Sequence, residues 1–511
     1  MATDSSELRT LSPLHQAAVH FPTHSALIWH QDGIRLALTY KDLSQKVIAL
    51  GEQLNAQGLS DGDRLACIDS NSIELIILYW ACIDTGILFC PLSPRFPIKQ
   101  IAKLIKQHRL NYIWAGDEYS PPFSRHKSSQ QPSPVKLFSE QSLSTATLKL
   151  DFTTSSLNSP IKIDQHKLAN IILTSGSSGT PKAAVHSLAN HLASALGSSA
   201  LIPLHAGDGW FLSLPLFHIG GLAIINRCAL AGATVVMQDK EINLPTQLSQ
   251  YPITHLSLVS TQLVRLLEAE FDVNTTPCLK GIRSLLLGGG AISVDLIDKL
   301  KTLSISSFTS YGMTEMSSQI TTGPASDDGN SGQTIFGREV KIRDELIYVK
   351  GETLFLGYLN WQGNQPLLDL PLDDEGWFAT KDRGYWDKQG SLHILGRSDN
   401  MFICGGENVQ PEEIEAALKQ HPDIEDAIVF PQIDSEFGNL PAAIIKFADP
   451  DQGFISRGPE SKTLTQFLHL HIARFKRPRV YYPWPEIESV SLKVPRKQII
   501  EAVLKRNQIL G

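Results

Sequence analysis

Short blocks of apolar and polar positions alternate along the first part of the chain. Residues 26–29 and 36–38 are apolar runs on either side of an Asp-Gly turn dipeptide, and they predict a β-hairpin. Thr39 then opens a predicted helix, because apolar residues recur at helical spacing beyond it. A short apolar strand at residues 65–68 and a helix over residues 73–85 follow. Strands and helices that alternate in this way are typical of an α/β architecture with parallel strands.

The alternation returns at Leu168 and continues past Gly290, after a segment rich in Ser, Pro, Gln and Thr at residues 119–159, which we expect to be a surface excursion. Residues 340–395 contain short strands and many turns. The predicted strands of the middle segment are residues 171–173, 210–214, 234–237, 255–259 and 284–287. The fold class expected is α/β: a large body of several subdomains, with mixed sheets flanked by helices and a small β-rich subdomain, followed by a small α+β C-terminal domain.

Residues 75–92 are the most apolar segment of the chain, but Asp84 and Gly86 interrupt them. A membrane-spanning helix needs about 20 apolar residues, so a core helix that runs into a buried strand is the better prediction. The N-terminus carries Asp4 and Glu7 and lacks the basic and apolar regions of a signal peptide. The sequence therefore predicts a soluble, cytoplasmic protein without a membrane span.

Composition narrows the class of protein further. The chain has 511 residues, enough for about three structural units. Its 45 Lys and Arg against 52 Asp and Glu leave a formal charge of -7, which argues against a sequence-independent nucleic-acid binder. Its six cysteines show no CxxC pair, so we expect small buried side chains in a reducing compartment rather than disulfides or a metal site.

A run of small residues follows the apolar strand at residues 171–173 and ends in a lysine. The run consists of Thr174, Ser175, Gly176, Ser177, Ser178, Gly179, Thr180, Pro181 and Lys182. Its backbone N–H groups and hydroxyls can bind phosphate oxygens, and the lysine adds a positive charge. The run does not fit the GxxxxGK[ST] pattern. A flexible linker is the alternative, but a position between a buried strand and a predicted helix favours phosphate binding.

Two further segments suit a nucleotide with a metal ion. The ring of Tyr311 can stack on a purine, Gly312 lets backbone and ligand approach closely, and Glu315 is a hard oxygen ligand suited to Mg²⁺. Asp382 can accept hydrogen bonds from ribose hydroxyls, and Arg397 can donate to the same sugar. Considered one at a time, Glu315, Asp382 and Arg397 would each be interpreted as a member of an ordinary ion pair.

Arg227 stands in an otherwise apolar predicted helix. A buried arginine must be paired, because an isolated charge in a low-dielectric interior is costly. One interpretation is an internal ion pair. The other is recognition of a second carboxylate on a substrate, to which the planar fork of a guanidinium is suited.

These segments, in this order, resemble the motifs of the adenylate-forming enzymes, a family that includes acyl-CoA synthetases, peptide-synthetase adenylation domains and luciferases. The matching segments are residues 174–182, 215–218, 288–291, 311–315, 380–382, 396–399 and 493–496. Lys381 stands where the family has glycine, and Ser491-Leu492 replaces the family's Ser-Gly before Lys493.

The resemblance implies roles for individual residues. It implies contacts with ATP from Thr174, Ser175, Gly176, Ser177, Ser178, Gly179, Thr180, Lys182, Gly289, Gly290, Ala291, Tyr311, Gly312, Asp382 and Arg397. It implies catalytic roles for Lys493, Thr314, Glu315 and His218, with Glu315 as the ligand of Mg²⁺. Lys493 would bridge the acyl carboxylate and the α-phosphate; the alternative for this residue is a solvated cation in a Lys/Arg-rich tail.

The resemblance also implies how the chain is divided. Residues 1–396 would form the adenylation body with the acid and ATP sites, residues 397–400 the hinge, and residues 401–511 a mobile C-terminal domain that carries Lys493. Asp399 would be the hinge residue, which lets one enzyme perform two half-reactions. Cys404 is expected to pack near the hinge rather than to act as a nucleophile.

Within the family, the surroundings of Arg227 resemble the o-succinylbenzoate–CoA ligases of menaquinone biosynthesis. This implies that Arg227 holds a substrate carboxylate, that His218 forms a pocket wall or gate, and that the segment after Glu315 contacts the acid. The residues implied in acid binding are His218, Arg227, Ser317, Ser318 and Gln319. ATP, Mg²⁺, coenzyme A as co-substrate and a small carboxylic acid would be the ligands.

Two alternatives stay open at this point. One is a CoA ligase for another aryl or medium-chain acid, and the other is an adenylating module that loads a carrier. A self-contained ligase is preferred, because no carrier segment with a phosphopantetheine-type serine follows Lys493. The sequence is compatible with a homo-oligomer.

Overall fold

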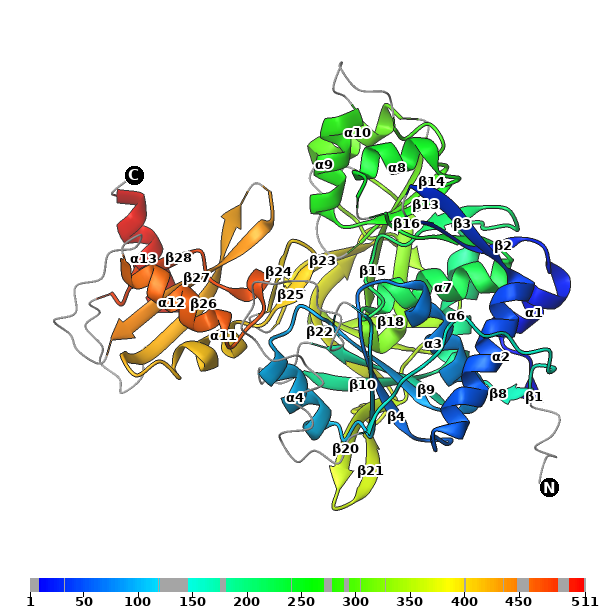
Figure 1. Cartoon of the computed structure of the whole chain (residues 1–511). Coiled ribbons are helices and arrows are strands. Elements are labelled where there is room, and N and C mark those ends of the chain that lie inside the picture. Colours follow the sequence, from blue (N-terminus) through cyan, green and yellow to red (C-terminus); the bar gives the residue numbers. More distant parts are fainter. Residues whose placement is uncertain are drawn as a thin grey trace. The chain divides into compact units, whose positions relative to one another are not determined.

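The structure is a computed structural model of the whole chain (Figure 1). It describes residues 9–31, 33–117, 119, 146–174, 181–239, 241–270, 278–288, 294–303, 305–326, 328–398, 401–434, 436–447, 459–485 and 496–509. The chain divides into two compact units: the first contains most of the residues up to Gly396, and the second begins at Arg397 and also takes in Arg95–Ile101.

Within the described residues, nine strands form the largest sheet of the first unit, in the order β17-β16-β15-β14-β13-β11-β12-β2-β3. The strands from β2 to β15 along this order pair in parallel, whereas β3, β16 and β17 are antiparallel additions at the two edges. The strands are β2 (Ser25–Gln31), β3 (Ile34–Thr39), β11 (Gly209–Phe211), β12 (Thr234–Val236), β13 (His255–Leu258), β14 (Ser284–Leu287), β15 (Ser306–Met313), β16 (Ser318–Pro324) and β17 (Gln333–Thr334).

A second sheet contains eight strands of the described chain, in the order β21-β20-β10-β9-β5-β4-β6-β7. It is parallel from β7 to β9 and antiparallel from β9 to β21. The strands are β4 (Arg64–Ile68), β5 (Leu88–Leu92), β6 (Tyr112–Ala115), β7 (Ala146–Thr147), β9 (Leu168–Thr174), β10 (Lys182–Ser187), β20 (Gly357–Gln362) and β21 (Gln365–Asp369). A short pair, β1 (Arg9–Thr10) with β8 (Ile163–Asp164), lies outside both sheets.

Helices cover these sheets and build the main core. Trp80 and Tyr79, among the largest fully buried side chains, lie in the same apolar cluster as Phe89 and Trp210. In Figure 1, α2, α3, α6 and α7 lie near one another, and α2 packs on α3 while α6 packs on α7. The helices are α1 (Pro13–His20), α2 (Tyr40–Ala56), α3 (Ile73–Thr85), α4 (Ile98–Gln107), α6 (Leu188–Ser199), α7 (Ile219–Ala231), α8 (Leu244–Gln250), α9 (Ser260–Glu270) and α10 (Val294–Lys301).

A smaller sheet of four strands in the described chain, in the order β18-β19-β22-β23, follows the nine-stranded one in sequence. Its strands are β18 (Arg338–Arg343), β19 (Leu346–Gly351), β22 (Phe378–Trp386) and β23 (Leu392–Arg397). Ile347, Val349 and Phe378 bury one face of this sheet in an apolar cluster that also contains Ala184 of β10 and Tyr358 of β20. This sheet is the β-rich subdomain that the turn-rich pattern of residues 340–395 predicts.

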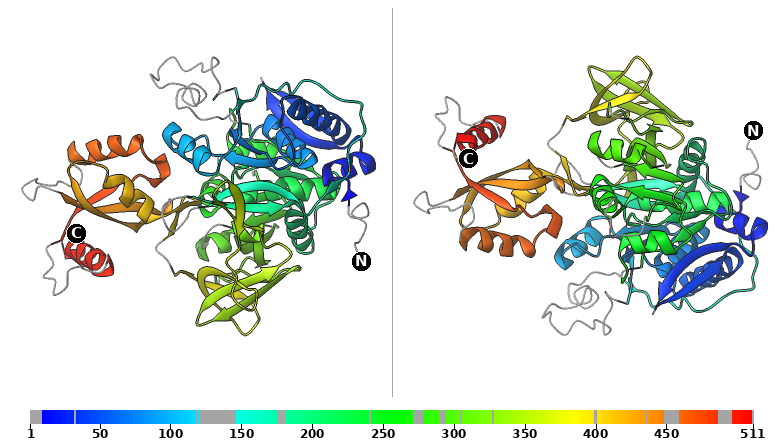
Figure 2. Two further views of the ribbon diagram at one scale, coloured as in Figure 1. Left: turned by 90° about the horizontal axis from the view of Figure 1, so that it is seen from below. Right: turned by 90° about the horizontal axis from the view of Figure 1, so that it is seen from above.

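The second unit is an α+β unit built on the sheet β26-β27-β28. Alternate residues of its strands face opposite sides: Val429 packs with α12, and Phe430 packs with α13. Both views in Figure 2 show the sheet between the orange α12 and the red α13. The elements are β24 (Phe402–Cys404), β25 (Glu407–Val409), α11 (Pro411–Leu418), β26 (Ile424–Asp434), β27 (Gly438–Phe447), α12 (Pro459–His469), η2 (Arg474–Lys476), β28 (Val480–Pro483) and α13 (Arg496–Ile509).

Several sequence-based expectations are confirmed. β2 and β3 form the predicted hairpin. The helix that begins after Thr39 carries a capping box with Asp42, and α3 ends at Gly86 in the left-handed conformation. The apolar segment at residues 75–92 is a core helix followed by the buried strand β5. All six cysteines are free and buried.

The expectation that a helix follows Lys182 is wrong. Lys182 is the first residue of β10, which pairs with β9 in antiparallel fashion and places Lys182 opposite Thr174. Three small or β-branched residues, Ala183, Ala184 and Val185, are buried there in the middle of a sheet. The helix starts later, after Ser187, whose side chain caps it in a reciprocal box with Asn190.

The surface excursion predicted at residues 119–159 is described only in part. Of its described residues, those after residue 145 run along α2, where Lys46 and Gln53 donate to the carbonyls of Phe152 and Asp151. The described helices include none with the length and apolar character that a crossing of a lipid bilayer requires.

Candidate active site

The segment from Tyr311 to Gln319 joins the last parallel strand, β15, to the antiparallel β16. A register shift between Tyr311 and Gly312 marks a bulge in this pair, which re-aims the side chains beside it. A Cβ at position 312 would collide with the main-chain carbonyl of Ser318. Glycine is therefore required because the two backbones approach so closely.

The hydroxyl of Tyr311 donates to Asp382 Oδ2 at 2.6 Å. Asp382 is 7% exposed, and its backbone N–H donates to Thr380 Oγ1 at 3.0 Å, so its position is set by its own strand. Lys381 adopts a φ of 65°, a left-handed conformation that favours the glycine found here in adenylate-forming enzymes. The structure thus brings together two residues 71 positions apart that the sequence assigns to one nucleotide.

Glu315 lies in the short helix η1 (Thr314–Met316) and is 8% exposed. Its Oε1 accepts a hydrogen bond from the Tyr358 hydroxyl at 2.7 Å. Lys182 Nζ lies 4.6 Å from the centre of the Tyr358 ring. The lysine that ends the Ser/Gly-rich run is therefore linked through one aromatic ring to the carboxylate predicted to bind Mg²⁺.

We call Tyr311, Asp382, Glu315, Tyr358 and Lys182 the tyrosine–carboxylate cluster. Its two tyrosines pack against the same apolar core. Each tyrosine donates its hydroxyl to one carboxylate, which orients that carboxylate without neutralising its charge.

A buried histidine, His186, holds the main chain beside Glu315. His186 Nε2 lies 2.7 Å from the carbonyl oxygen of Thr314. Because a carbonyl can only accept, Nε2 carries the hydrogen and the imidazole uses its single proton there. Burial lowers the pKa of His186 to about 4, so the ring is neutral at physiological pH. His186 thus fixes the main chain at the residue before Glu315.

Arg227 projects from the apolar helix α7 and is 5% exposed. Its Nη2 donates to Gln319 Oε1 at 2.6 Å, and its guanidinium lies 5.1 Å from the ring centre of Trp210. Its buried Nε has no hydrogen-bond partner among the described residues. Burial lowers the pKa of Arg227 to about 10, which leaves it charged at neutral pH.

The interpretation of Arg227 as half of an internal ion pair finds no support. Among the residues that the structure describes, its partners are a neutral amide and an aromatic face. Gln319 also donates to Thr322 Oγ1 at 2.7 Å, which fixes the amide so that its oxygen faces the arginine. The buried charge therefore lacks an internal anion in the described part of the chain.

Ser317 and Ser318 form the turn between these two regions, both with positive φ, at 53° and 113°. Ser317 Oγ donates to the carbonyl of Thr353 at 2.9 Å, and the carbonyl of Ser317 accepts from Ser194 Oγ at 2.6 Å. The proton of the Ser317 hydroxyl is thus already used, and only its lone pairs remain for a ligand. The turn is a constrained one that its neighbours hold in place.

His218 is the N-cap residue of α7. The centre of its ring lies 4.9 Å from the centre of the Phe217 ring. Asn71 fixes the chain before it, since Asn71 Oδ1 accepts from the backbone N–H of Leu216 at 2.9 Å. His218 therefore begins the same helix that carries Arg227, nine positions later in the sequence.

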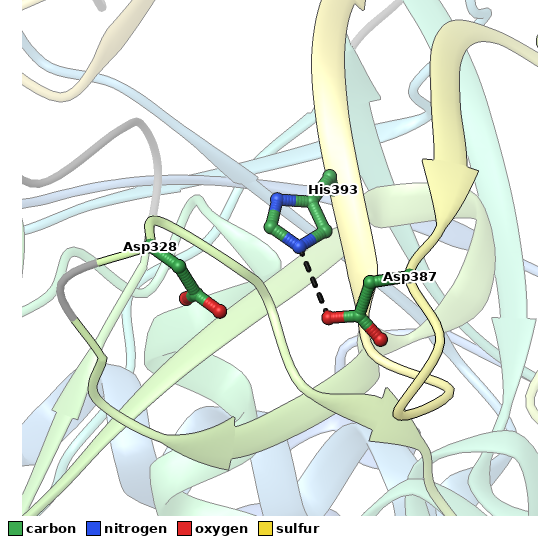
Figure 3. A group of neighbouring side chains, drawn as sticks. All are labelled: Asp328, Asp387 and His393. Atoms are coloured by element: carbon green, nitrogen blue, oxygen red, sulfur yellow. Dashed lines mark hydrogen bonds and ion pairs between the residues drawn. The ribbon is translucent and has the colours of Figure 1, made fainter.

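One group of potential metal ligands lies elsewhere among the described residues: Asp328, Asp387 and His393, whose ligating atoms are within 4.8 Å of one another. Figure 3 shows His393 Nε2 turned towards Asp387, with which it shares a hydrogen bond of 3.1 Å. Hydrogen bonds from the backbone of Ser391 and from His393 help to keep the pKa of Asp387 low. These interactions satisfy His393 and Asp387 without a metal ion, and the group is separate from Glu315.

A family model described as AMP-binding enzyme matches residues 14–359, more than half of the chain. The chain belongs to the AMP-binding enzyme family. The matched range contains every member of the tyrosine–carboxylate cluster except Asp382, and it contains Arg227 and Gln319 as well.

Relatives within the AMP-binding enzyme family match nearly the whole chain. The 2-succinylbenzoate–CoA ligase of Haemophilus influenzae is 34% identical over 474 residues, which cover 92% of this chain and 94% of the relative. A double mutant of the o-succinylbenzoate CoA synthetase of Bacillus subtilis, solved with a product analogue, has a TM-score of 0.82 at 26% identity and covers 97% of this chain and 99% of its own. The same synthetase solved with ATP and magnesium has a TM-score of 0.65 at 25% identity, with coverages of 96% and 100%. These matches confirm the predicted α/β fold class.

Several of the predicted site residues lie outside the described part of the structure. They are Ser175, Gly176, Ser177, Ser178, Gly179, Thr180, Gly289, Gly290, Ala291, Asp399 and Lys493. Of Arg397, the structure describes the backbone, as the last residue of β23, but not the side chain.

Sequence reasoning missed Tyr358, His186 and Trp210, which contact predicted site residues. Each lies in a strand and carries no motif of its own. Tyr358 reaches the site only because β20 pairs with β10 and sets Tyr358 opposite Ala184. The apolar runs show that such strands exist but not which of them are neighbours.

Proposed function

We propose that this protein is an ATP-dependent acid–CoA ligase that converts o-succinylbenzoate to o-succinylbenzoyl-CoA through an acyl-adenylate, a step of menaquinone biosynthesis. Relatives that bear the name 2-succinylbenzoate–CoA ligase and match over nearly the full length support this function. ATP, Mg²⁺ and coenzyme A are the proposed ligands besides the acid.

The observation that carries the proposal is the buried pair of Arg227 and Gln319. o-Succinylbenzoate has two carboxylates, of which one is activated and the other stays free. A buried guanidinium whose partners are neutral offers a charge-assisted, planar contact for the free carboxylate. An acid with a single carboxylate would leave that charge without a counterion, at the cost of an unpaired buried cation.

In the first half-reaction, the substrate carboxylate attacks the α-phosphorus of ATP and pyrophosphate leaves. We assign the phosphates to Lys182 with the Ser/Gly-rich run, the purine to Tyr311 and the ribose to Asp382. Glu315 would hold Mg²⁺, which neutralises charge that develops on the phosphates. The Tyr358 hydroxyl keeps one oxygen of Glu315 oriented, and His186 holds the main chain beside it.

The adenylation lysine of this scheme is Lys493, with His218 at the acid gate and Thr314 beside the adenylate. Residues 397–400 would form the hinge, with Asp399 as its pivot, between an adenylation body at residues 1–396 and a mobile domain at residues 401–511. Lys493→Ala should abolish adenylation but spare thioester formation from supplied acyl-adenylate. Equal loss of both steps would contradict this division of labour.

We place the enzyme in the cytoplasm, where free thiols such as its six buried cysteines stay reduced. Its partners are small molecules, and it can act as a self-contained ligase or within a homo-oligomer. A ligase for another aryl or medium-chain acid, and a module that loads a carrier, remain as alternatives that the same assay separates.

The decisive assay measures acid-dependent pyrophosphate release over a panel of acids, with and without coenzyme A. The proposal predicts the highest kcat/KM with o-succinylbenzoate, and thioester formation when coenzyme A is present. Good turnover with a monocarboxylic acid and none with o-succinylbenzoate would refute it. Adenylate formation without any transfer to coenzyme A would favour the carrier-loading alternative.

A further inference from the structure

A second buried arginine lies close to the first. Arg338 is the first residue of β18 and is 6% exposed. Its Nε donates to the main-chain carbonyl of Gln319 at 2.9 Å, and its Nη1 donates to the carbonyl of Phe336 at 2.7 Å. Longer bonds reach the carbonyl of Ala193 at 3.4 Å and Ser194 Oγ at 3.2 Å. All these acceptors are neutral.

Arg338 and Arg227 meet at one residue. Arg227 bonds to the side chain of Gln319, and Arg338 bonds to its main chain. We call these three residues the arginine cluster. Burial, and next the charge of Arg227, lower the pKa of Arg338 to about 9. Neither arginine has a carboxylate partner among the described residues, so the arginine cluster concentrates buried positive charge.

The surroundings of Arg338 are built to hold it there. A Cβ at Gly197 of α6 would collide with Arg338 Nη1 and with the carbonyl of Phe336. Ser194, one turn earlier on α6, accepts from Arg338 and donates to the carbonyl of Ser317. Arg338 thus supports, from two directions, the strained turn that leads into Gln319.

We propose that Arg338 is a positioning residue that sets substrate specificity: it holds Gln319 and adds a second buried positive charge beside Arg227, so that the site prefers an acid with a second carboxylate. This inference rests on the proposed function and assigns part of its selectivity to a residue outside every motif of the sequence. A carboxylate bound at Arg227 Nε would compensate the charge of both arginines.

A purely structural role would look different. An arginine that only satisfies carbonyls would, when removed, lower the stability of the fold and affect all substrates alike. A specificity role predicts that the loss falls on the acid with two carboxylates. The two roles are therefore separated by the choice of substrate.

The test compares Arg338→Met, Arg338→Lys and the wild-type enzyme in the pyrophosphate-release assay. The substrates are o-succinylbenzoate and 4-oxo-4-phenylbutanoate, which lacks the aromatic carboxylate. Arg338→Met should raise the KM for o-succinylbenzoate roughly tenfold, the size expected for one charged hydrogen-bonding group. The KM for 4-oxo-4-phenylbutanoate and for ATP should stay within about twofold of the wild-type values. Arg338→Lys, which keeps the charge, should recover part of the selectivity.

Arg343→Met is the matched control, because Arg343 ends the same strand but pairs with Asp373 and Glu375 at the surface. It should leave the selectivity unchanged. If Arg338→Met fails to fold, Ser194→Ala provides a second route, because it removes the hydroxyl that accepts from Arg338 and donates to the carbonyl of Ser317. This variant should also lower the preference for o-succinylbenzoate over 4-oxo-4-phenylbutanoate.

An equal loss for both acids, or no change in the ratio of their kcat/KM values, would overturn the inference. Equal selectivity of Arg338→Lys and Arg338→Met would overturn the role of the charge. Failure of the proposed function has a different signature, because the wild-type enzyme itself would then not activate o-succinylbenzoate.

Discussion

In the tyrosine–carboxylate cluster, each buried carboxylate accepts a hydrogen bond from a tyrosine hydroxyl: Tyr311 serves Asp382, and Tyr358 serves Glu315. In the arginine cluster, the donors are the charged groups and the acceptors are neutral oxygens. These hydrogen-bond partners are all neutral, and the cation of the first cluster, Lys182, lies over the ring of Tyr358. Neutral hydrogen-bond partners orient a charged side chain and leave its charge available to a ligand of opposite charge.

The two clusters differ in how visible they are in the sequence. The carboxylates stand in short motifs whose residue types already suggest nucleotide and metal chemistry. Arg227 is visible in the sequence only as a charge in an apolar helix, and Arg338 stands at the start of a strand without any motif. Under the proposed function, the residues that select the acid are brought together by tertiary contacts rather than by a sequence motif.

Glu315→Gln should have the largest effect, because it removes the anionic oxygen proposed to hold Mg²⁺ while keeping the size of the side chain. Adenylation should slow by on the order of 100-fold. Pyrophosphate release at several Mg²⁺ concentrations measures this. Glu375→Gln, at a surface ion pair with Lys341, is the control and should stay near the wild-type rate. A wild-type rate for Glu315→Gln would remove Glu315 from the metal site.

The two tyrosines can be compared by paired substitutions to phenylalanine. Each removes one hydroxyl that donates to a carboxylate, so each should cost roughly tenfold in kcat/KM. Tyr358→Phe should raise the Mg²⁺ concentration for half-maximal rate, and Tyr311→Phe should raise the KM for ATP. If both variants shift the same parameter, Asp382 and Glu315 do not serve separate parts of the ligand.

His186 gives the smallest effect, which concerns stability and its dependence on pH. The pKa of His186 is lowered from 6.5 to about 4 in the fold, so between these pH values the unfolded chain binds the proton and the native chain does not. Stability of the native state is therefore lost as the pH falls through this window, by up to about 1.4 kcal/mol per pH unit.

His186→Gln keeps a donor for the Thr314 carbonyl but cannot titrate. Urea unfolding at pH 7, 6 and 5 should show a smaller loss of stability on acidification than in the wild-type protein. The exposed His205→Gln serves as control and should follow the wild-type curve. Identical slopes for His186→Gln and the wild-type protein would show that His186 is not held neutral by burial.

Much of the fold follows from sequence, because capping residues and apolar periodicity are local signals. Thr39 with Asp42 and the glycine after α3 mark helix ends directly. Strand order is not local, and so the neighbours of Lys182 could not be predicted: its strand runs back along β9 instead of leading into a helix. The partners of Arg227 and Glu315 come from β16 and β20, whose places depend on the same sheet topology.

The most direct test of the account is the ratio of kcat/KM for o-succinylbenzoate to that for 4-oxo-4-phenylbutanoate, measured for the wild-type enzyme and for Arg227→Met. We predict a strong wild-type preference for o-succinylbenzoate that falls by about tenfold or more in Arg227→Met, with the KM for ATP unchanged. Equal ratios in the two proteins would contradict it and return Arg227 to a purely structural role.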